Sequence, residues 1–281
     1  MPPGVPRHPR STIAPPLDFA SWRPLNNGDD AGCERTKPLQ VFIVGCARSG
    51  TSVVYRAVRE VLELPGEGEG HVLPIFVTMM HNYKLYVDEF KGTNGILAEK
   101  LELRTFRTAL VDYIQEVYFR FYPGGSWVDK TPGSEATVGA TFIVEAFPDA
   151  RIIATRRTGV EVVNSFQKKF SATFEDSCEA WAASMGVLEY ILRSYPQILC
   201  IDQFDLANRP RAMGTAIADH FERPEKADAF ADYLTASRED KNSAHSWEHR
   251  LTAKAAGWSE DQIATFTRIC GDLMHRFDYS I

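Results

Sequence analysis

The chain has 281 residues, of which 44% are hydrophobic and 24% are charged, and its formal net charge is −6. This composition is typical of one soluble globular domain with a sizeable core. The acidic balance argues against nucleic acid as a partner, because sequence-independent binding to a polyanion requires an excess of Lys and Arg. No apolar run is long enough to predict a membrane span, and the N-terminus lacks the apolar segment of a signal peptide. We therefore expect neither nucleic acid nor membrane as a partner.

The five cysteines are scattered along the chain and never spaced as C-x-x-C. This pattern predicts neither a disulfide framework nor a zinc ribbon, so we expect a cytoplasmic protein without a metal. The sequence gives no indication of the oligomeric state.

Residues 1–38 hold many of the prolines and show no hydrophobic periodicity, so we expect a poorly ordered arm there and one domain over 39–281. Strand-like runs occur at 39–45, 151–155 and 197–201. Helix-like segments lie between and around them, at 52–64, 97–121, 134–147, 160–169, 178–195, 211–221 and 261–277. The alternation predicts an α/β fold in which helices flank a central parallel sheet.

The first motif, Gly45-Cys-Ala-Arg-Ser-Gly-Thr-Ser52, leaves a predicted strand and opens a predicted helix. Backbone N–H groups and the helix dipole bind anionic oxygens at such a place. The spacing is that of the nucleoside-triphosphate loop G-x-x-x-x-G-K-[ST], but Thr51 replaces the lysine of that loop, which disfavours an NTPase or kinase. Arg48 supplies a positive charge instead, with a fork that suits phosphate or sulfate oxygens. The alternative is a plain turn in which Thr51 or Ser52 only caps the helix.

This motif resembles the 5′-phosphosulfate loop of the sulfotransferase superfamily, whose usual core is P-R-S-G-T-T; Ala47 and Ser52 are mild departures. The resemblance implies a single P-loop-NTPase-like domain and the sulfuryl donor 3′-phosphoadenosine 5′-phosphosulfate (PAPS). It also implies contacts to the 5′-phosphosulfate from five loop residues, of which the first is also a catalytic candidate: Arg48, Ser49, Gly50, Thr51 and Ser52.

The glycine-rich run Pro65-Gly-Glu-Gly-Glu-Gly-His71 looks like the G-E segment that supplies a catalytic glutamate in tyrosylprotein and carbohydrate sulfotransferases. Glu69 aligns best with that base. His71 and Glu67 remain alternatives, because other branches of the family use a histidine and the glycine spacing is permissive. A solvated acidic loop without a catalytic part is the remaining interpretation.

Trp127-Val-Asp-Lys-Thr-Pro132 resembles the family's W-x-x-K-[TD]-P segment, which lies beside the phosphosulfate. The resemblance makes Lys130 a catalytic candidate that stabilises charge on the sulfuryl group or the leaving oxygen. The alternative is a surface lysine in a proline-terminated turn, paired with Asp129.

Arg157 ends a predicted strand, and Ser165 follows it two helical turns into the next helix. This pair is similar to the family's site for the 3′-phosphate of the donor, and the preceding run from Phe147 to Thr155 resembles the lead-in F-P-[DN]-A-[KR]. A charge-assisted arginine contact suits a phosphate with about two negative charges. We expect Arg156 to point elsewhere. A solvated arginine and a serine without a ligand are the alternative.

Two other functions compete with sulfuryl transfer. His245-Ser-Trp-Glu-His249 matches the H-x-x-E-H signature of inverted zincin metalloproteases, although the stretch before it is polar and no third ligand is apparent. A small-molecule kinase or an inactive nucleotide-binding scaffold would also use an anion loop. The sequence favours a sulfotransferase that acts on a hydroxyl or amine of a small-molecule, carbohydrate or peptide acceptor. The helical insertion 75–121 is a candidate lining for the acceptor pocket, but a helical stripe of Met and aromatic residues is more often part of the core, so we assign no acceptor residue.

Overall fold

A computed structural model describes residues 38–92, 102–239 and 249–281. All of them belong to the compact unit Lys37–Ile281. Four strands form one parallel sheet in the order β2-β1-β3-β4. They are β1 (Gln40–Gly45), β2 (Trp127–Lys130), β3 (Arg151–Arg156) and β4 (Leu199–Asp202). The predicted α/β class is confirmed.

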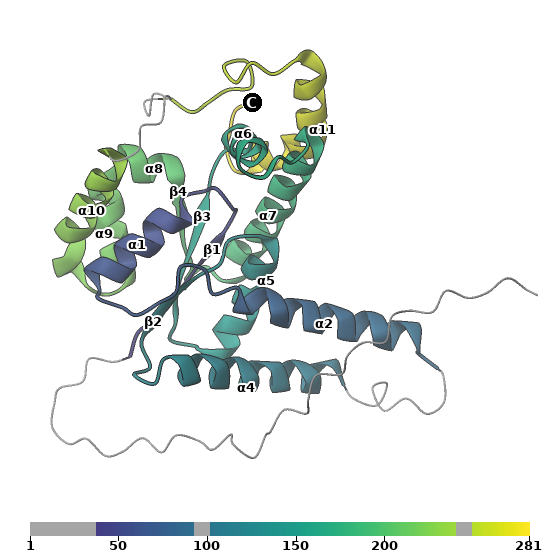
Figure 1. Cartoon of the computed structure of the whole chain (residues 1–281), viewed down its shortest axis with the longest axis vertical. Helices are drawn as coiled ribbons and strands as arrows, with labels where there is room; N and C mark the ends of the chain where they lie inside the picture. Colours follow the sequence, from purple (N-terminus) through teal and green to yellow (C-terminus); the bar gives the residue numbers. More distant parts are fainter. Residues whose placement is uncertain (1–37, 93–101, 240–248) are drawn as a thin grey trace, which may run out of the picture. The chain divides into compact units, whose positions relative to one another are not determined.

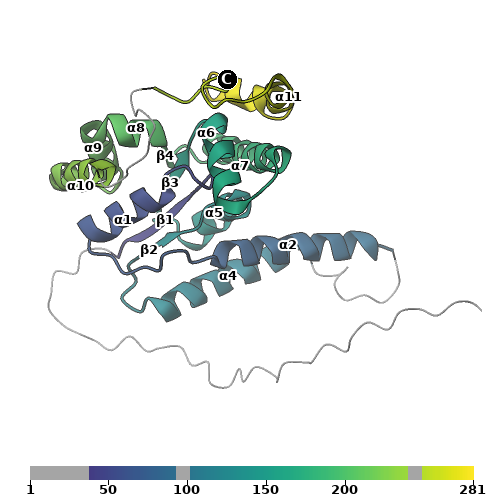
Figure 2. The ribbon, with the colours of Figure 1, turned by 45° about the horizontal axis from the view of Figure 1, so that its top comes forward.

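Helices cover both faces of this sheet (Figures 1 and 2). One face carries α1 (Thr51–Val61), α9 (Pro210–His220) and α10 (Ala227–Glu239), and the other carries α5 (Ser134–Ala146), α6 (Gly159–Phe170) and α7 (Phe174–Ser194). The remaining elements are α2 (Val72–Glu89), α4 (Leu103–Phe121), α8 (Gln203–Asn208), the 3₁₀ turn η2 (Pro224–Lys226) and α11 (Glu260–Arg276), of which α11 packs on α7. In the described residues, none of the helices is both long and apolar enough to cross a membrane.

The central strand β1 is buried on both sides because its side chains alternate between two cores. Phe42 and Val44 pack with the helices on the side of α5 and α7, whereas Val41 and Ile43 pack with α1, α9 and α10. A continuous apolar run is therefore what this position in the sheet requires.

The three predicted strands are present, each within two residues of the expected bounds. The fourth, β2, was not predicted as a strand, because only four residues form it and two of these are Asp129 and Lys130. Both are nevertheless buried. The predicted helical insertion 75–121 corresponds, in its described part, to most of α2, which begins at Val72, and to all of α4.

Candidate active site

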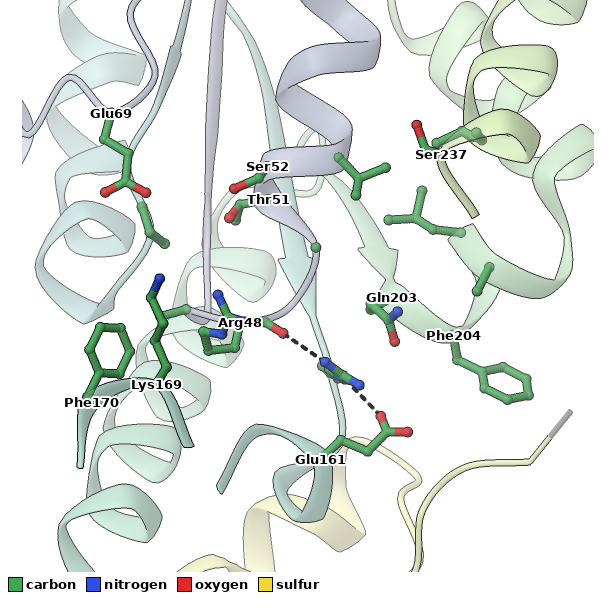
Figure 3. A pocket seen from close by; sticks show the side chains of 18 of the residues that line it. Arg48, Thr51, Ser52, Glu69, Glu161, Lys169, Phe170, Gln203, Phe204 and Ser237 are labelled. Atoms are coloured by element: carbon green, nitrogen blue, oxygen red, sulfur yellow. Dashed lines mark hydrogen bonds and ion pairs between the residues drawn. The ribbon is translucent and has the colours of Figure 1, made fainter. Parts of the chain in front are cut away.

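The carboxyl ends of parallel strands share one edge of the sheet, and the segments that follow β1, β3 and β4 meet there. They surround a pocket of about 900 Å³ (Figure 3). The wall is built from the loop before α1, the segment 65–71, both ends of α6, and residues of α8 and α10. Motifs that are far apart in the sequence therefore line one cavity.

The loop between β1 and α1 has a backbone that depends on two glycines. Gly45 has φ +120°, and a Cβ there would lie 2.2 Å from the carbonyl oxygen of Thr155 on β3. Gly50, the N-cap of α1, has φ +94°, and Arg48 adopts the left-handed region with φ 69°. Only glycine takes the first position without a clash, so the loop is fixed tightly against the sheet.

The loop opens the N-terminus of α1 toward the pocket. Arg48, Gly50, Thr51 and Ser52 line the cavity, and no side chain caps the first turn of the helix. The first N–H groups of an α-helix have no partner within the helix and carry partial positive charge. This part of the pocket is therefore suited to an anion.

Ser49 has a different position from its neighbours in the loop. Its side chain is fully buried and hydrogen-bonds the hydroxyl of Thr155 at 2.6 Å and the carbonyl oxygen of Cys46. Its backbone N–H also donates to that carbonyl, at 3.3 Å. The side chain of Ser49 thus ties the loop to β3, and the predicted contact of this residue with a ligand stays a prediction. The pKa of the neighbouring Cys46 thiol is raised by burial to about 12, so this thiol stays protonated.

Arg48, Arg157 and Ser165, which come from two separate sequence motifs, lie close together. The Nε of Arg48 donates to the Oγ of Ser165 at 2.8 Å, and Arg157 donates to the carbonyl oxygen of Arg48 at 3.2 Å. Arg157 also forms an ion pair with Glu161, one turn along α6, at 3.0 Å. Glu161 holds the arginine in place and reduces the positive charge around it.

Arg156 points away from this cluster, as predicted. Its guanidinium lies 3.5 Å from the buried carboxylate of Asp202, which also binds Arg250 at 3.1 Å and accepts a hydrogen bond from the hydroxyl of Tyr279 at 2.6 Å. The other oxygen of Asp202 accepts from the backbone N–H of Phe204 at 2.9 Å and so caps α8. Asp202 thereby positions the part of α8 that lines the pocket.

At the end of the pocket opposite Gln203 and Phe204, Glu69 lies between Lys130 and His71 (Figure 3). Its carboxylate oxygens are 2.6 Å from the Nζ of Lys130 and 2.8 Å from the Nε2 of His71. The hydrogen bond from Lys130 lowers the pKa of Glu69. The side chain of Lys130 is only 4% exposed, so the interpretation as a surface lysine paired with Asp129 is wrong. Glu69 and His71 line the pocket, whereas Glu67 is exposed and is not part of the described lining.

The segment that carries Glu69 is pressed against β2. A Cβ at Gly66 would lie 2.2 Å from the carbonyl oxygen of Val128, and a Cβ at Gly70 would lie 2.3 Å from a carboxylate oxygen of Asp129. These glycines permit close approach to the strand. These contacts fix the position of Glu69. They argue against the interpretation of the segment as a solvated acidic loop.

A buried hydrogen-bond chain completes the support. Asp129 accepts from the hydroxyls of Tyr118 and Thr131, and the hydroxyl of Thr131 accepts from the backbone N–H of His71 at 3.1 Å. Burial raises the pKa of Asp129 and raises that of Tyr118 strongly. Asp129 is therefore a structural partner of the segment 65–71.

Several pocket residues were not found from the sequence. Gln203 and Phe204 follow β4, so the rule that ligands bind at the carboxyl ends of strands could have indicated them. Lys169 and Phe170 end α6, about one turn beyond Ser165. Their spacing from Ser165 along the helix, about one turn, could have indicated that they lie on the same side of α6.

The H-x-x-E-H match falls mainly on residues outside the described part of the chain, since 240–248 are not described. His249 is described and lines the pocket. Among the residues that the structure describes, no group of three or more His, Cys, Asp or Glu side chains could hold a metal ion.

Comparison with known families decides the classification. A model with the description "Sulfotransferase family" matches residues 38–228, which include all of the motifs around the pocket. The chain belongs to the sulfotransferase family. No match was found among curated proteins.

Solved structures of other sulfotransferases share the fold of this family member. The sulfotransferase domain of the Synechococcus PCC 7002 olefin synthase is 18% identical, with a TM-score of 0.52 and coverage of 89% of this chain and 98% of that chain. The sulfotransferase domain from the curacin biosynthetic pathway is 15% identical, with a TM-score of 0.50 and coverage of 88% and 100%. Sulfotransferase STF9 from Mycobacterium avium is 11% identical, with a TM-score of 0.50 and coverage of 88% and 79%. At these identities the likeness is one of fold.

Proposed function

We propose that this protein transfers a sulfuryl group from PAPS to a hydroxyl or amine of its acceptor. The observation that carries the proposal is the arrangement of one pocket. An uncapped helix N-terminus and two arginines form an anion site in it, and a carboxylate paired with a buried lysine lies at its other end.

The residues present fit the donor. The first turn of α1 and Arg48 suit the 5′-phosphosulfate, while Arg157 and Ser165 suit the 3′-phosphate. In this proposal the side chain of Ser49 contributes by holding the loop in its shape. The far wall, with Phe204 and other apolar side chains, suits the adenine ring, and a volume of about 900 Å³ lies within the range of ligand pockets.

When bound, PAPS supplies the sulfuryl group, whose sulfur forms a bond to the acceptor while its bond to the phosphate oxygen breaks and adenosine 3′,5′-bisphosphate leaves. Glu69 accepts the proton of the acceptor hydroxyl or amine, with His71 as the alternative base at the same place. Arg48 neutralises charge on the oxygens of the leaving phosphate.

Lys130 serves both the base and the transferred group. In the structure it neutralises Glu69, and this contact keeps the carboxylate weakly basic. If the ammonium group of Lys130 moved toward the sulfuryl group, it would no longer be paired with the carboxylate of Glu69, and the pKa of Glu69 would rise. The base would then become stronger in the loaded site than in the empty one.

Nucleotide titration tests the proposal. We expect adenosine 3′,5′-bisphosphate to bind to the full chain more tightly than adenosine 5′-phosphate or ATP with magnesium, as measured by isothermal titration calorimetry. Arg157→Ala should weaken the bisphosphate by about tenfold or more, since hydrogen bonds to charged groups contribute about 1.5–3 kcal/mol.

Arg193→Ala is the matched control. Arg193 also forms an ion pair with a glutamate one turn away on a helix, but its side chain is 74% exposed and does not line the pocket. This variant should bind like the wild type. Binding of ATP with magnesium alone would favour a kinase, and equal affinity for the two adenosine phosphates would contradict the 3′-phosphate site.

A further inference from the structure

The end of α6 contributes a lysine and a phenylalanine to the pocket. Lys169 and Phe170 lie at the same end of the cavity as Glu69, with Arg48 between them and the end formed by Gln203 and Phe204 (Figure 3). Because Glu69 is the proposed base, this is the end at which an acceptor has to place its reacting group.

Lys169 differs from the other cationic side chains of the pocket wall. Arg48 is hydrogen-bonded to Ser165, and Arg157 is paired with Glu161. In the described part of the chain, Lys169 has neither a hydrogen-bond partner nor an ion-pair partner. The two carboxylates that line the pocket cannot serve it, because Glu69 binds Lys130 and Glu161 binds Arg157.

The proposed binding of the donor does not involve the positive charge of Lys169. The proposed sites for its two anionic ends already hold the arginines, the first turn of α1 and Ser165. Lys169 lies four residues beyond Ser165 on α6, on the side of Glu69. A pocket cation without a partner among the described residues favours an anionic group of a ligand, because such a contact is charge-assisted.

Apolar surface accompanies Lys169 at this end of the pocket. Phe170 is 56% exposed although it lines the pocket. Binding becomes more favourable by about 25 cal/mol for each Å² of exposed aromatic surface that a ligand buries. The acceptor end of the pocket is thus both apolar and positively charged.

We infer that the acceptor is an acid with an apolar body: a hydroxyl or amine on a ring or chain that also carries a carboxylate or another anionic group. This inference rests on the proposed function, which defines the acceptor end. Lys169 binds the anionic group, Phe170 covers the apolar body, and the reacting hydroxyl or amine faces Glu69.

Binding of a matched pair of probes tests the inference. The probes are a hydroxynaphthoate and the matching hydroxynaphthamide, which differ only in the charge of one substituent. They are titrated by fluorescence into the full chain saturated with adenosine 3′,5′-bisphosphate. We expect the naphthoate to bind about tenfold more tightly than the amide, and Lys169→Met to abolish that preference.

Lys168→Met is the control, since it removes the same charge from the adjacent, exposed residue that does not line the pocket. It should keep the tenfold preference. Phe170→Ser should weaken both probes equally. Equal binding of the two probes to the wild type, binding of neither, or a preference that survives Lys169→Met would overturn the inference.

Two further titrations separate this inference from the proposed function. If Lys169→Met weakens PAPS but not the bisphosphate, the lysine binds the sulfuryl group and the inference is wrong. If the bisphosphate does not bind to the wild type, the proposed donor is wrong; the probes are then titrated into the protein alone and judged by the same criteria.

Discussion

Among the individual residues, Glu69 has the most informative surroundings. Its carboxylate is held between a buried lysine and an exposed histidine, and the lysine lowers its pKa. A base must be deprotonated to act, and it acts better the more strongly it holds a proton. The pairing with Lys130 therefore keeps Glu69 deprotonated but a weak base; if Glu69 is the proposed base, it becomes stronger only when the lysine moves away.

The position of Glu69 leads to a prediction about its titration. In Lys130→Met, which keeps the length of the side chain, the cation is absent and the pKa of Glu69 should rise toward the ordinary glutamate value. Protonation on lowering the pH then begins at a higher pH than in the wild type, so the acidic limb of any activity profile moves upward as well. The measurement is the pH dependence of the carboxyl ¹³C shift of Glu69.

The control for that titration is Lys168→Met, which removes a lysine outside the pocket wall and should leave the Glu69 midpoint unchanged. An unaltered midpoint in Lys130→Met would show that Lys130 does not hold the carboxylate in solution.

Sequence motifs predicted which residues would meet, but not how every side chain would point. Arg48 contacts both Ser165 and Arg157, while the roles of these residues in binding stay predictions. Ser49 faces the protein interior, and Lys169 was overlooked. A motif records spacing along the chain, whereas side-chain direction depends on the fixed backbone of the loop.

At the scale of elements, the glycine-rich segment 65–71 illustrates an ambiguity of sequence. Glycines at alternate positions indicate either flexibility or close packing. The structure uses Gly66 and Gly70 for close packing against β2, while a Cβ at Gly68 would meet no atom within 4 Å. The strand partner that resolves this ambiguity, β2, is itself too short and polar to be recognised from its sequence.

The contrast between these glycines predicts three different alanine variants. Gly66→Ala and Gly70→Ala should each lower the free energy of unfolding by about 1–3 kcal/mol, because the new methyl group overlaps a buried neighbour. Gly68→Ala should change it by no more than about 0.5 kcal/mol, since it faces open space. Urea unfolding of the three variants measures the differences, and similar losses in all three would contradict the packed arrangement.

For the molecule as a whole, the alternation of strands and helices predicted a parallel sheet but not its strand order. In the order β2-β1-β3-β4, the chain continues from β1 to a neighbour on one side and then to β3 on the other. The crevice between β1 and β3 is thus a switch point, where ligands bind in such sheets. Loop residues after these two strands, Arg48 and Arg157, meet there. Strand order depends on long-range packing, which local periodicity does not encode.

The end of the chain is attached to this sheet through Asp202. The side chain of Asp202 is only 2% exposed. Its carboxylate joins the end of β4 to Arg156, to Arg250 and to Tyr279. Burial raises the pKa of Tyr279, so the hydroxyl remains a hydrogen-bond donor. One buried acid thus connects the sheet, the segment after residue 249 and the C-terminus.

Replacing this acid should destabilise the whole fold. Asp202→Asn keeps the shape but leaves two arginines without their carboxylate, and breaking a buried pair costs about 3–5 kcal/mol; we expect about 3 kcal/mol because both arginines are partly exposed. Asp205→Asn is the control, since its partner Arg209 is 68% exposed at 3.6 Å and such pairs contribute about 0–1 kcal/mol. Urea unfolding compares the two variants. Because Asp202 also caps α8 beside the pocket, its loss should weaken the bisphosphate as well. Equal stability of the two variants would mean that the C-terminus is held by apolar packing alone.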